Sequence, residues 1–399
     1  MNLAGYQDEL PRDRDTALKV NISWHHFYPA ASTTPWQLEG AIRAMKEDGY
    51  DPALIHACHN RTVVIDARLG ERENKQLPVV DAHGLRNVHL YDPGEAWLDI
   101  REAIGDLADR FLVLNDVYPD GFSIPKRFIG ENIIHLPTVK THYFTTTTGA
   151  MKNAFGGLLN ERRHWTHPVI HETLVDLLRI QQSIHSGIFA VMDGTFAGDG
   201  PGPRCMNVHV KNVILASADQ VAIDAVAARM MGFDPLGIRY IRLAHDLELG
   251  CGDPADIEIV GDRQAAAENW HFESPLENLT FAGRMQHEIY WGRLKSILEW
   301  SLRTWLAPWS YIASVVYHDA WWYPRLGNRR MRQALQSDWG RLFANWERLD
   351  PDDRGFADLG PEPSWGHSTG QLLAMAGGIL GTAMRESPEL AARKRRRPK

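Results

Sequence analysis

The chain has 399 residues, of which 44% are apolar and 23% are charged, and this ordinary composition excludes a disordered or coiled-coil protein. The net charge of −7 argues against a general nucleic-acid binder, which is usually basic. Three cysteines without a C-x-x-C pair exclude a zinc ribbon or a self-contained iron–sulfur cluster, and they fit a reducing compartment. Residues 1–15 are too polar for a signal peptide, and no apolar run reaches the roughly 18 residues of a membrane span. We therefore expect a cytoplasmic protein without a transmembrane segment.

Apolar strand-like segments and helical segments alternate along the first two thirds of the chain. The predicted strands are 17–24, 62–67, 87–92, 111–117, 131–139 (with a break at Pro137), 187–193, 211–217 and 256–262. The predicted helices are 35–48, 95–108, 149–158, 168–186, 219–231 and 235–249. This alternation predicts an α/β fold, with helices on the faces of a mixed or parallel sheet. We expect residues 1–265 to form this body, in two lobes.

Tryptophan dominates the remainder of the chain, since ten of the fourteen indoles lie from Trp270 onward. Residues 266–384 are predicted to be helical and to pack their indoles on the body, because aromatic side chains at helical spacings are mostly core. The alternative is a surface that touches a membrane, a protein partner or a second copy of the chain. Residues 385–399 form a basic tail, which we expect to be solvated and disordered.

A turn rich in lysine and threonine spans residues 134–157, IHLPTVKTHYFTTTTGAMKNAFGG. Two of its side chains, Lys140 and His142, lie two residues apart and so share one side of an extended strand. The threonine run and glycine then start a helix, whose free amides and nearby lysine favour an anion. The alternative is an ordinary capped helix with solvated lysines. The turn offers these cations and hydrogen-bonding groups: Lys140, His142, Thr148, Lys152 and Asn153.

A glycine- and proline-rich loop, DGTFAGDGPGP, follows the strand that ends near Asp193. Ligands of open α/β sheets gather at the carboxyl ends of strands, and glycines such as Gly200 let the backbone approach a ligand closely. The loop could equally be a long turn. Further on, Asp224 lies inside an apolar helical run, where a carboxylate needs a partner. We expect it to hydrogen-bond a neighbouring loop in a structural role; the alternative is that it serves the site.

Three histidines, His164, His167 and His171, have the spacing H-x2-H-x3-H. On one α-helix they would share a face, so three imidazoles could bind a divalent metal such as zinc or nickel. Pro168 could place His164 before the helix and so separate it from the others. A further metal candidate is the pair His25 and His26, beside Trp24.

These segments, in this order, resemble the DUF362 family of proteins of unknown function, from about Lys19 to Gly261. The resemblance rests on Lys19 and Asn21 in the first strand (with Val20 where the family pattern has proline), LPTVKTH with TGAMKNAFG, the GDGPGP loop, ASADQVAIDAVAARMMGFDP and GDPADIEIVG. It implies kinship with the two-domain α/β fold of lactate-racemase-like proteins. Many members carry a ferredoxin-like segment with clustered cysteines, which this chain lacks.

Together these features predict an enzyme that acts on a small carboxylate or phosphate. Its cation and donor set would be Lys19, Asn21, Lys140, His142, Thr148, Lys152, Asn153 and the backbone at Gly200. His142 is the expected general acid or base, Lys140 is expected to act beside it as a catalytic residue, and Asp193 is a second acid–base candidate or a metal ligand. The reaction could be proton abstraction beside a carbonyl. Two alternatives stay open: a redox protein of an iron–sulfur-associated family, and a non-catalytic binding or scaffold protein. The sequence does not identify a cofactor.

Overall fold

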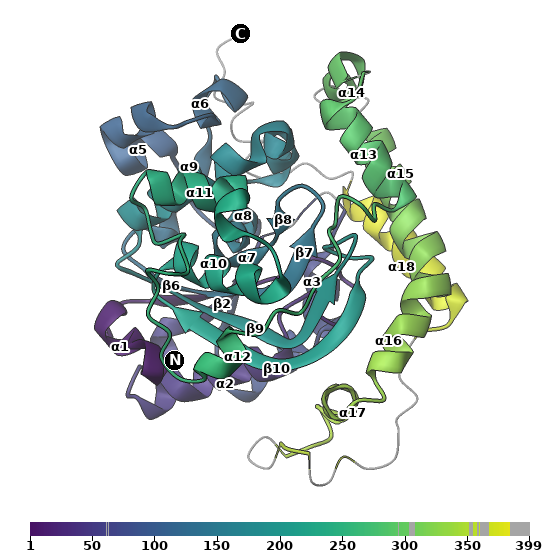
Figure 1. The fold of residues 1–399 in the computed structure, drawn as a ribbon, viewed down its shortest axis with the longest axis horizontal. Helices are drawn as coiled ribbons and strands as arrows, with labels where there is room; N and C mark the ends of the chain where they lie inside the picture. The colour runs from purple at the N-terminus through teal and green to yellow at the C-terminus, as the bar shows by residue number, and fades with distance from the viewer. Residues whose placement is uncertain are drawn as a thin grey trace.

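The computed structural model describes the whole chain except residues 61, 63, 294, 303–307, 351–353, 357–358, 360–366 and 384–399. Its centre is an eight-stranded sheet, to which a two-stranded sheet is added (Figure 1). The main sheet contains β1 (Thr16–Val20), β2 (Ile55–His59), β3 (Arg86–His89), β6 (Asn132–Leu136), β7 (Thr138–His142), β8 (Thr146–Thr147), β9 (Gly187–Asp199) and β10 (Asn207–Ser217), and the small sheet contains β4 (Trp97–Asp99) and β5 (Ser123–Pro125).

The strand order gives the sheet a mostly parallel character. β1 lies between β2 and β6, β3 extends the sheet beyond β2, and β9 follows β6, all in parallel. β10 returns antiparallel along the far edge of β9. Pro137 divides the strand into β6 and β7, which confirms the predicted break, and both parts pair with β9. The fold is therefore mixed α/β, with a switch in strand order between β1 and β6.

Helices cover both faces of this sheet. Their bounds are α1 (Tyr6–Glu9), α2 (Pro35–Glu47), α3 (Ala67–Glu73), α4 (Gln76–Ala82), α5 (Ile100–Ile104), α6 (Leu114–Val117), α7 (Gly149–Asn153), α8 (Phe155–Leu158), α9 (Ile170–Ile184), α10 (Gln220–Met231), α11 (Arg239–Asp246) and α12 (Arg263–Ala266). Alternate residues of each strand point to opposite faces. Ala17 and Ile133 pack with α9, α10 and α11, whereas Leu18 and Ile134 pack with α2 and α4. The core therefore lies in two layers, one on each side of the sheet.

A column of helices lies along one side of the sheet (Figure 1). It comprises α13 (Phe281–Trp291), α14 (Lys295–Leu302), α15 (Pro308–Val315), a π-helical segment (Val316–Gly327), α16 (Asn328–Ala334), α17 (Asp338–Asn345) and α18 (Thr369–Ala383). Phe343 stacks on Phe27 of the body with ring centroids 3.5 Å apart, and Tyr323 donates a hydrogen bond to the Phe27 carbonyl. The helical C-terminal region is therefore packed on the body. No helix among the described residues is long and apolar enough to cross a membrane.

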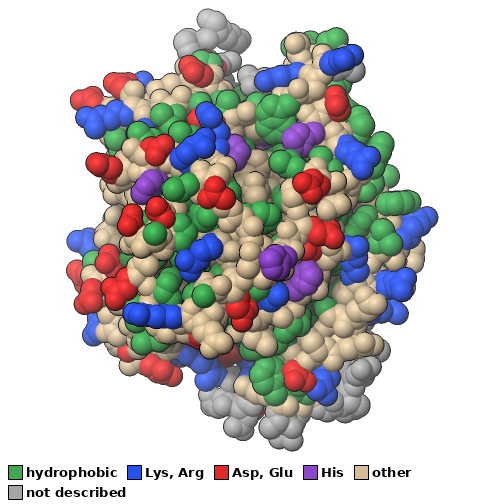
Figure 2. All heavy atoms as spheres, in the orientation of Figure 1, with side chains coloured by type: hydrophobic (Ala, Val, Ile, Leu, Met, Phe, Trp, Pro, Cys, Tyr) green, Lys and Arg blue, Asp and Glu red, His purple; other side chains and the backbone are tan. Residues whose placement is uncertain are grey.

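The indoles of this region divide between core and surface. Trp322 and Trp346 are buried, whereas Trp291, Trp300, Trp309 and Trp321 are 39–59% exposed. Hydrophobic side chains gather along the flank that the column forms (Figure 2). The prediction that the indoles pack on the body thus holds for only part of them. Trp305, Trp365 and the basic tail lie outside the described residues.

Several local predictions from the sequence are wrong. Residues 111–117 form no strand, because the Asp176 carboxylate accepts hydrogen bonds from three successive amides of residues 112–114 and α6 starts there. The described residues of segment 62–67 and the segment 256–262 form no strand either, and residues 95–108 contain β4 before α5 begins. The strand β2 was not predicted, because its two histidines, His56 and His59, make a fully buried segment look polar in the sequence.

Candidate functional site

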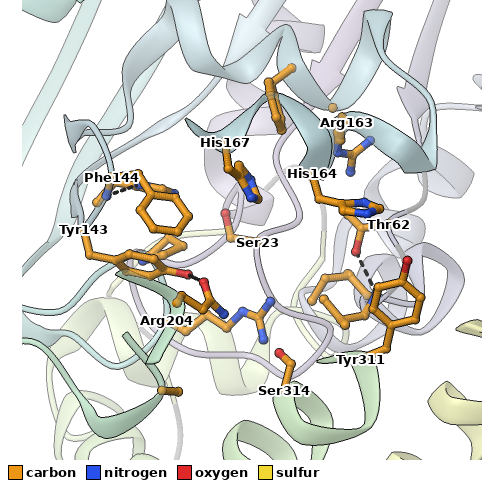
Figure 3. Close-up of a pocket in the computed structure, with 18 of the residues that line it drawn as sticks. Ser23, Thr62, Tyr143, Phe144, Arg163, His164, His167, Arg204, Tyr311 and Ser314 are labelled. Carbon is orange, nitrogen blue, oxygen red and sulfur yellow. Dashed lines mark hydrogen bonds between the residues drawn. The ribbon is translucent and has the colours of Figure 1, made fainter. Parts of the chain in front are cut away.

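A cavity of about 510 Å³ lies where the parallel strands end at their carboxyl termini (Figure 3). The segment that follows β1, the residues that follow β2 and the turn that follows β7 form one wall, together with α7 and the 3-10 helix Glu161–Val169. The opposite wall comes from α13, α15 and the start of the π-helical segment. Open α/β sheets bind ligands at this edge, beside a switch in strand order. The C-terminal helices thus complete a site whose floor belongs to the sheet.

The structure brings most of the predicted site residues together in this cavity. Those that line it are Lys19, Asn21, His142, Thr148, Lys152, Asn153, His164 and His167. Four predicted residues do not line it: Lys140, Asp193, Gly200 and His171.

Positive charge dominates the cavity. Its described lining contains two lysines, two arginines and four histidines, and it contains no aspartate or glutamate. Burial, and then Arg163, lowers the pKa of Lys152 to about 7. Burial also lowers the pKa of Lys19 to about 8. The Nη1 atom of Arg204 is buried without a hydrogen-bond partner among the described residues, and Figure 3 shows this guanidinium reaching into the cavity.

His142 is held as a neutral hydrogen-bond donor. Its Nδ1 accepts a hydrogen bond from the Phe144 amide at 3.1 Å, which leaves the proton of the neutral ring on Nε2. Burial, and then the neighbouring Lys152, lowers the pKa of His142 well below its usual value. The sequence predicts His142 as the general acid or base because histidine titrates near neutrality. In this environment the imidazole instead suits donation to a developing negative charge.

Lys140 supports the cavity wall from behind. Its buried Nζ donates hydrogen bonds to the Ala31 carbonyl at 2.6 Å, to Thr138 Oγ1 at 3.0 Å and to Ser23 Oγ at 3.2 Å. Ser23 itself lines the cavity. We therefore assign Lys140 a positioning role in place of the predicted catalytic one, because its Nζ already donates these three hydrogen bonds.

Asp193 and Gly200 have structural roles instead of the predicted ones. The buried Asp193 carboxylate accepts hydrogen bonds from Thr34 Oγ1 at 2.6 Å, from the Thr195 amide at 2.7 Å and from Trp36 Nε1 at 3.1 Å. The Gly200 carbonyl accepts a hydrogen bond from Thr141 Oγ1, so the glycine-rich loop is fastened to β7. Of that loop and the residues just after it, Pro203 and Arg204 reach the cavity.

The predicted anion site on the amides of α7 is already filled by the protein itself. The Asp224 carboxylate of α10 accepts hydrogen bonds from the amides of Ala150 at 2.5 Å and Met151 at 3.2 Å. A Cβ on Gly149, whose φ is +68°, would lie 2.2 Å from that carboxylate. The structural role predicted for Asp224 is confirmed. The Thr148 hydroxyl does not cap the helix, and it is buried without a partner in the described part of the chain.

The histidines His164, His167 and His171 do not form the predicted metal site. His164 and His167 lie in the 3-10 helix, and His171 lies in α9, so they do not share one α-helical face. His171 stacks on Tyr240, away from the cavity, while His167 Nδ1 is 3.1 Å from the Tyr290 hydroxyl. Among the described residues, two other groups of histidine and carboxylate converge closely enough to hold a metal, and neither includes this trio.

One of those groups adjoins the cavity through His59. Its members are His59, Glu71 and His89, with each imidazole Nε2 about 3 Å from Glu71 Oε2. Asn87 donates to the same oxygen at 2.9 Å. The group is thus joined by its own hydrogen bonds, which stabilise the wall next to β2 and β3.

Sequence reasoning missed the residues that only folding brings to the cavity. Arg163 and Arg204 had no motif that singled them out, although Arg204 follows the glycine-rich loop directly. Tyr290, Tyr311 and Ser314 come from the C-terminal helices, where the sequence carries only a general aromatic signal.

Comparison with known proteins places the body of this molecule in a family. The family model for a domain of unknown function, DUF362, matches residues 16–229, which contain the sheet and every predicted site residue. A thylakoid-associated protein of Synechocystis sp. is 26% identical over 159 residues, which are 37% of this chain and 48% of that protein. The chain thus spans about half the length of the curated relative it matches. No solved structure matches it. With more than half of its length covered by that family model, the chain belongs to the DUF362 family.

Proposed function

We propose that this protein is an enzyme that binds a small anionic substrate, a carboxylate or a phosphate ester, in the cavity at the carboxyl ends of the strands. The observation that carries the proposal is the charge of the described lining, in which four cationic side chains face no carboxylate. Gathering positive charge in a partly enclosed cavity is costly, and a bound anion would offset that charge. The volume of about 510 Å³ suits a small organic acid or ester.

Lys152 is the group best suited to move a proton. Its pKa of about 7 lies at the value that general acid–base catalysis favours, so a large share of the amine is unprotonated at neutral pH. In the same cavity, the Nε2–H of neutral His142 and the unpartnered Nη1 of Arg204 are donors for a developing oxyanion.

These roles fit proton abstraction from a carbon beside a carbonyl. The C–H bond breaks, its proton goes to the Lys152 amine, and its electron pair moves to the carbonyl oxygen as an enolate. His142 and Arg204 would stabilise that oxygen. Lys19 and Arg163 would hold the carboxylate or phosphate of the substrate.

Deuterium exchange tests the reaction. The wild-type protein is incubated in D₂O with a panel of small 2-oxo acids and phosphorylated ketones, and loss of the proton beside the carbonyl is followed by NMR. We expect Lys152→Met to slow exchange by about 100-fold or more, the usual contribution of a positioned acid or base. Lys46→Met is the control, because Lys46 is exposed on α2. Exchange that is equally fast in wild type and Lys152→Met would refute the role of Lys152.

Calorimetry tests the binding step separately. Inorganic phosphate and acetate are titrated into wild type, Arg204→Gln and Lys46→Met. We expect Arg204→Gln to weaken binding about tenfold, as removal of one charge-assisted hydrogen bond should. Absence of binding to the wild type at millimolar concentrations of either anion would contradict the proposed substrate class.

A further inference from the structure

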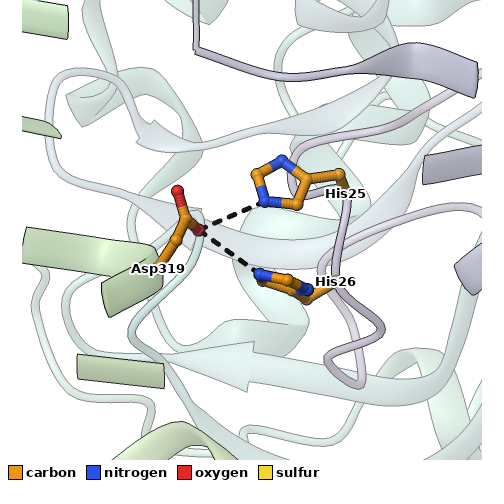
Figure 4. Close-up of side chains that lie close together, drawn as sticks. All are labelled: His25, His26 and Asp319. Carbon is orange, nitrogen blue, oxygen red and sulfur yellow. Dashed lines mark ion pairs between the residues drawn. The ribbon is translucent and has the colours of Figure 1, made fainter. Parts of the chain in front are cut away.

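Three buried side chains from distant parts of the chain lie close together (Figure 4). His25 and His26 follow β1, and Asp319 lies in the π-helical segment. All three side chains are 0% exposed. The Nε2 atom of His25 lies 3.3 Å from Asp319 Oδ1, and the Nε2 atom of His26 lies 3.8 Å from the same oxygen.

The polar atoms of this cluster are largely unsatisfied. All four imidazole nitrogens and Asp319 Oδ2 are buried without a hydrogen-bond partner in the described part of the chain. Asp319 Oδ1 accepts a hydrogen bond from Trp24 Nε1 at 2.5 Å. Buried polar atoms nearly always have partners, because an unpaired one costs about 1–3 kcal/mol. Five such atoms in one cluster point to a ligand.

The chemistry of the cluster also indicates what that ligand is. Two imidazole rings and one carboxylate are ligands that transition metals favour, and their ligating atoms all lie within 4.8 Å of one another. The aromatic rings of Trp24 and Tyr323 pack against His26. A buried carboxylate among imidazole rings and apolar rings favours a cation as its partner.

We propose that His25, His26 and Asp319 bind a divalent transition-metal ion, with zinc as the best fit. Two ligands of a tetrahedral zinc ion lie about 3.3–3.4 Å apart, close to the separations between the imidazole nitrogens and the carboxylate. Imidazole nitrogen favours zinc and its neighbours over magnesium or calcium, which prefer oxygen. Trp24 would orient the carboxylate from outside the coordination sphere, as such partners commonly do.

The proposed metal would fasten the C-terminal helices to the sheet. Ser23 and Tyr317, each two residues before a member of the cluster, line the cavity on its two walls. The other histidine–carboxylate group, His59, Glu71 and His89, is by contrast already joined by hydrogen bonds. It therefore provides a matched control within the same chain.

The test begins with the untagged wild-type protein and needs no variant. Metal is removed with a chelator, and zinc is titrated back against a chromophoric competitor, while cobalt(II) is added to a parallel sample for its visible spectrum. We expect one zinc per chain, intense cobalt bands of a tetrahedral site, and a higher melting temperature with zinc. A wild-type protein that takes up no zinc at micromolar concentrations would overturn the proposal.

Variants then locate the site. We expect Asp319→Asn and His26→Gln each to weaken zinc binding at least tenfold and to reduce the cobalt bands, whereas His89→Gln should bind like the wild type. Loss of zinc in His89→Gln, with binding retained in Asp319→Asn, would overturn the assignment. Circular dichroism of each metal-free variant checks the fold. If Asp319→Asn does not fold, His26→Gln and the wild-type stoichiometry still decide the question.

Discussion

Replacing Lys152 with methionine should change how the stability of the protein depends on pH. The lysine pKa falls from 10.5 in the unfolded chain to about 7 in the folded cavity, because burial, and then Arg163, disfavours the charged amine. Below pH 7 both states hold the proton, and the folded protein bears the full cost of the buried charge. As the pH rises, Lys152 loses its proton in the folded state before it does so in the unfolded state. The free-energy penalty of the buried charge therefore diminishes.

The magnitude follows from this difference in bound protons. Between pH 7 and pH 9 the unfolded lysine stays protonated while the folded one does not, and each such proton changes the free energy of unfolding by up to about 1.4 kcal/mol per pH unit. Because half of the folded amines are still protonated at the start of this interval, the expected gain is about 2 kcal/mol for the wild type relative to Lys152→Met. Lys19, which also has a lowered pKa, is present in both proteins and cancels in the comparison.

Urea unfolding of wild type and Lys152→Met at pH 6, 7, 8 and 9, without phosphate, measures this difference. We expect the variant to be the more stable protein at pH 6 and to lose that advantage steadily as the pH rises. Lys46→Met serves again as the exposed control and should run parallel to the wild type. A difference between wild type and Lys152→Met that stays constant from pH 6 to pH 9 would refute the reasoning.

Three further outcomes are expected. Gly149→Ala should destabilise the protein by about 1–3 kcal/mol in urea unfolding, because its Cβ would lie 2.2 Å from the Asp224 carboxylate at a φ of +68°; an unchanged midpoint would contradict this packing. Arg354→Ala should cost about 3 kcal/mol, since the guanidinium contacts both oxygens of buried Glu39 and joins the C-terminal region to α2; a loss below about 0.5 kcal/mol would show that this contact does not hold the two parts together. Anaerobically purified protein should contain far less than one iron and one acid-labile sulfide per chain, because three isolated cysteines do not supply the usual four thiolates; near-stoichiometric values would favour the redox alternative.

Local sequence patterns determined the general architecture and half of the candidate site. Alternating apolar strands and helices predict the α/β body because each element must bury one face, and Pro137 predicts the break between β6 and β7 because proline cannot donate a ladder hydrogen bond. Lys19 and His142 lie at the carboxyl ends of their strands, and Lys152 lies in the helix that follows β7. Their convergence on one cavity follows from the parallel arrangement of those strands.

Only the tertiary structure decided how these groups are used, because each decision depends on a contact between distant segments. Asp224 from α10 occupies the amides that the sequence assigned to an anion. The Phe144 amide fixes the His142 ring as a donor, and burial beside Arg163 moves the pKa of Lys152 to about 7. The C-terminal helices close the cavity and bring Asp319 to the two histidines after β1. Hydrophobic periodicity in the sequence indicates which face of a helix or strand is apolar. It does not indicate which side chain from a distant segment will contact that face.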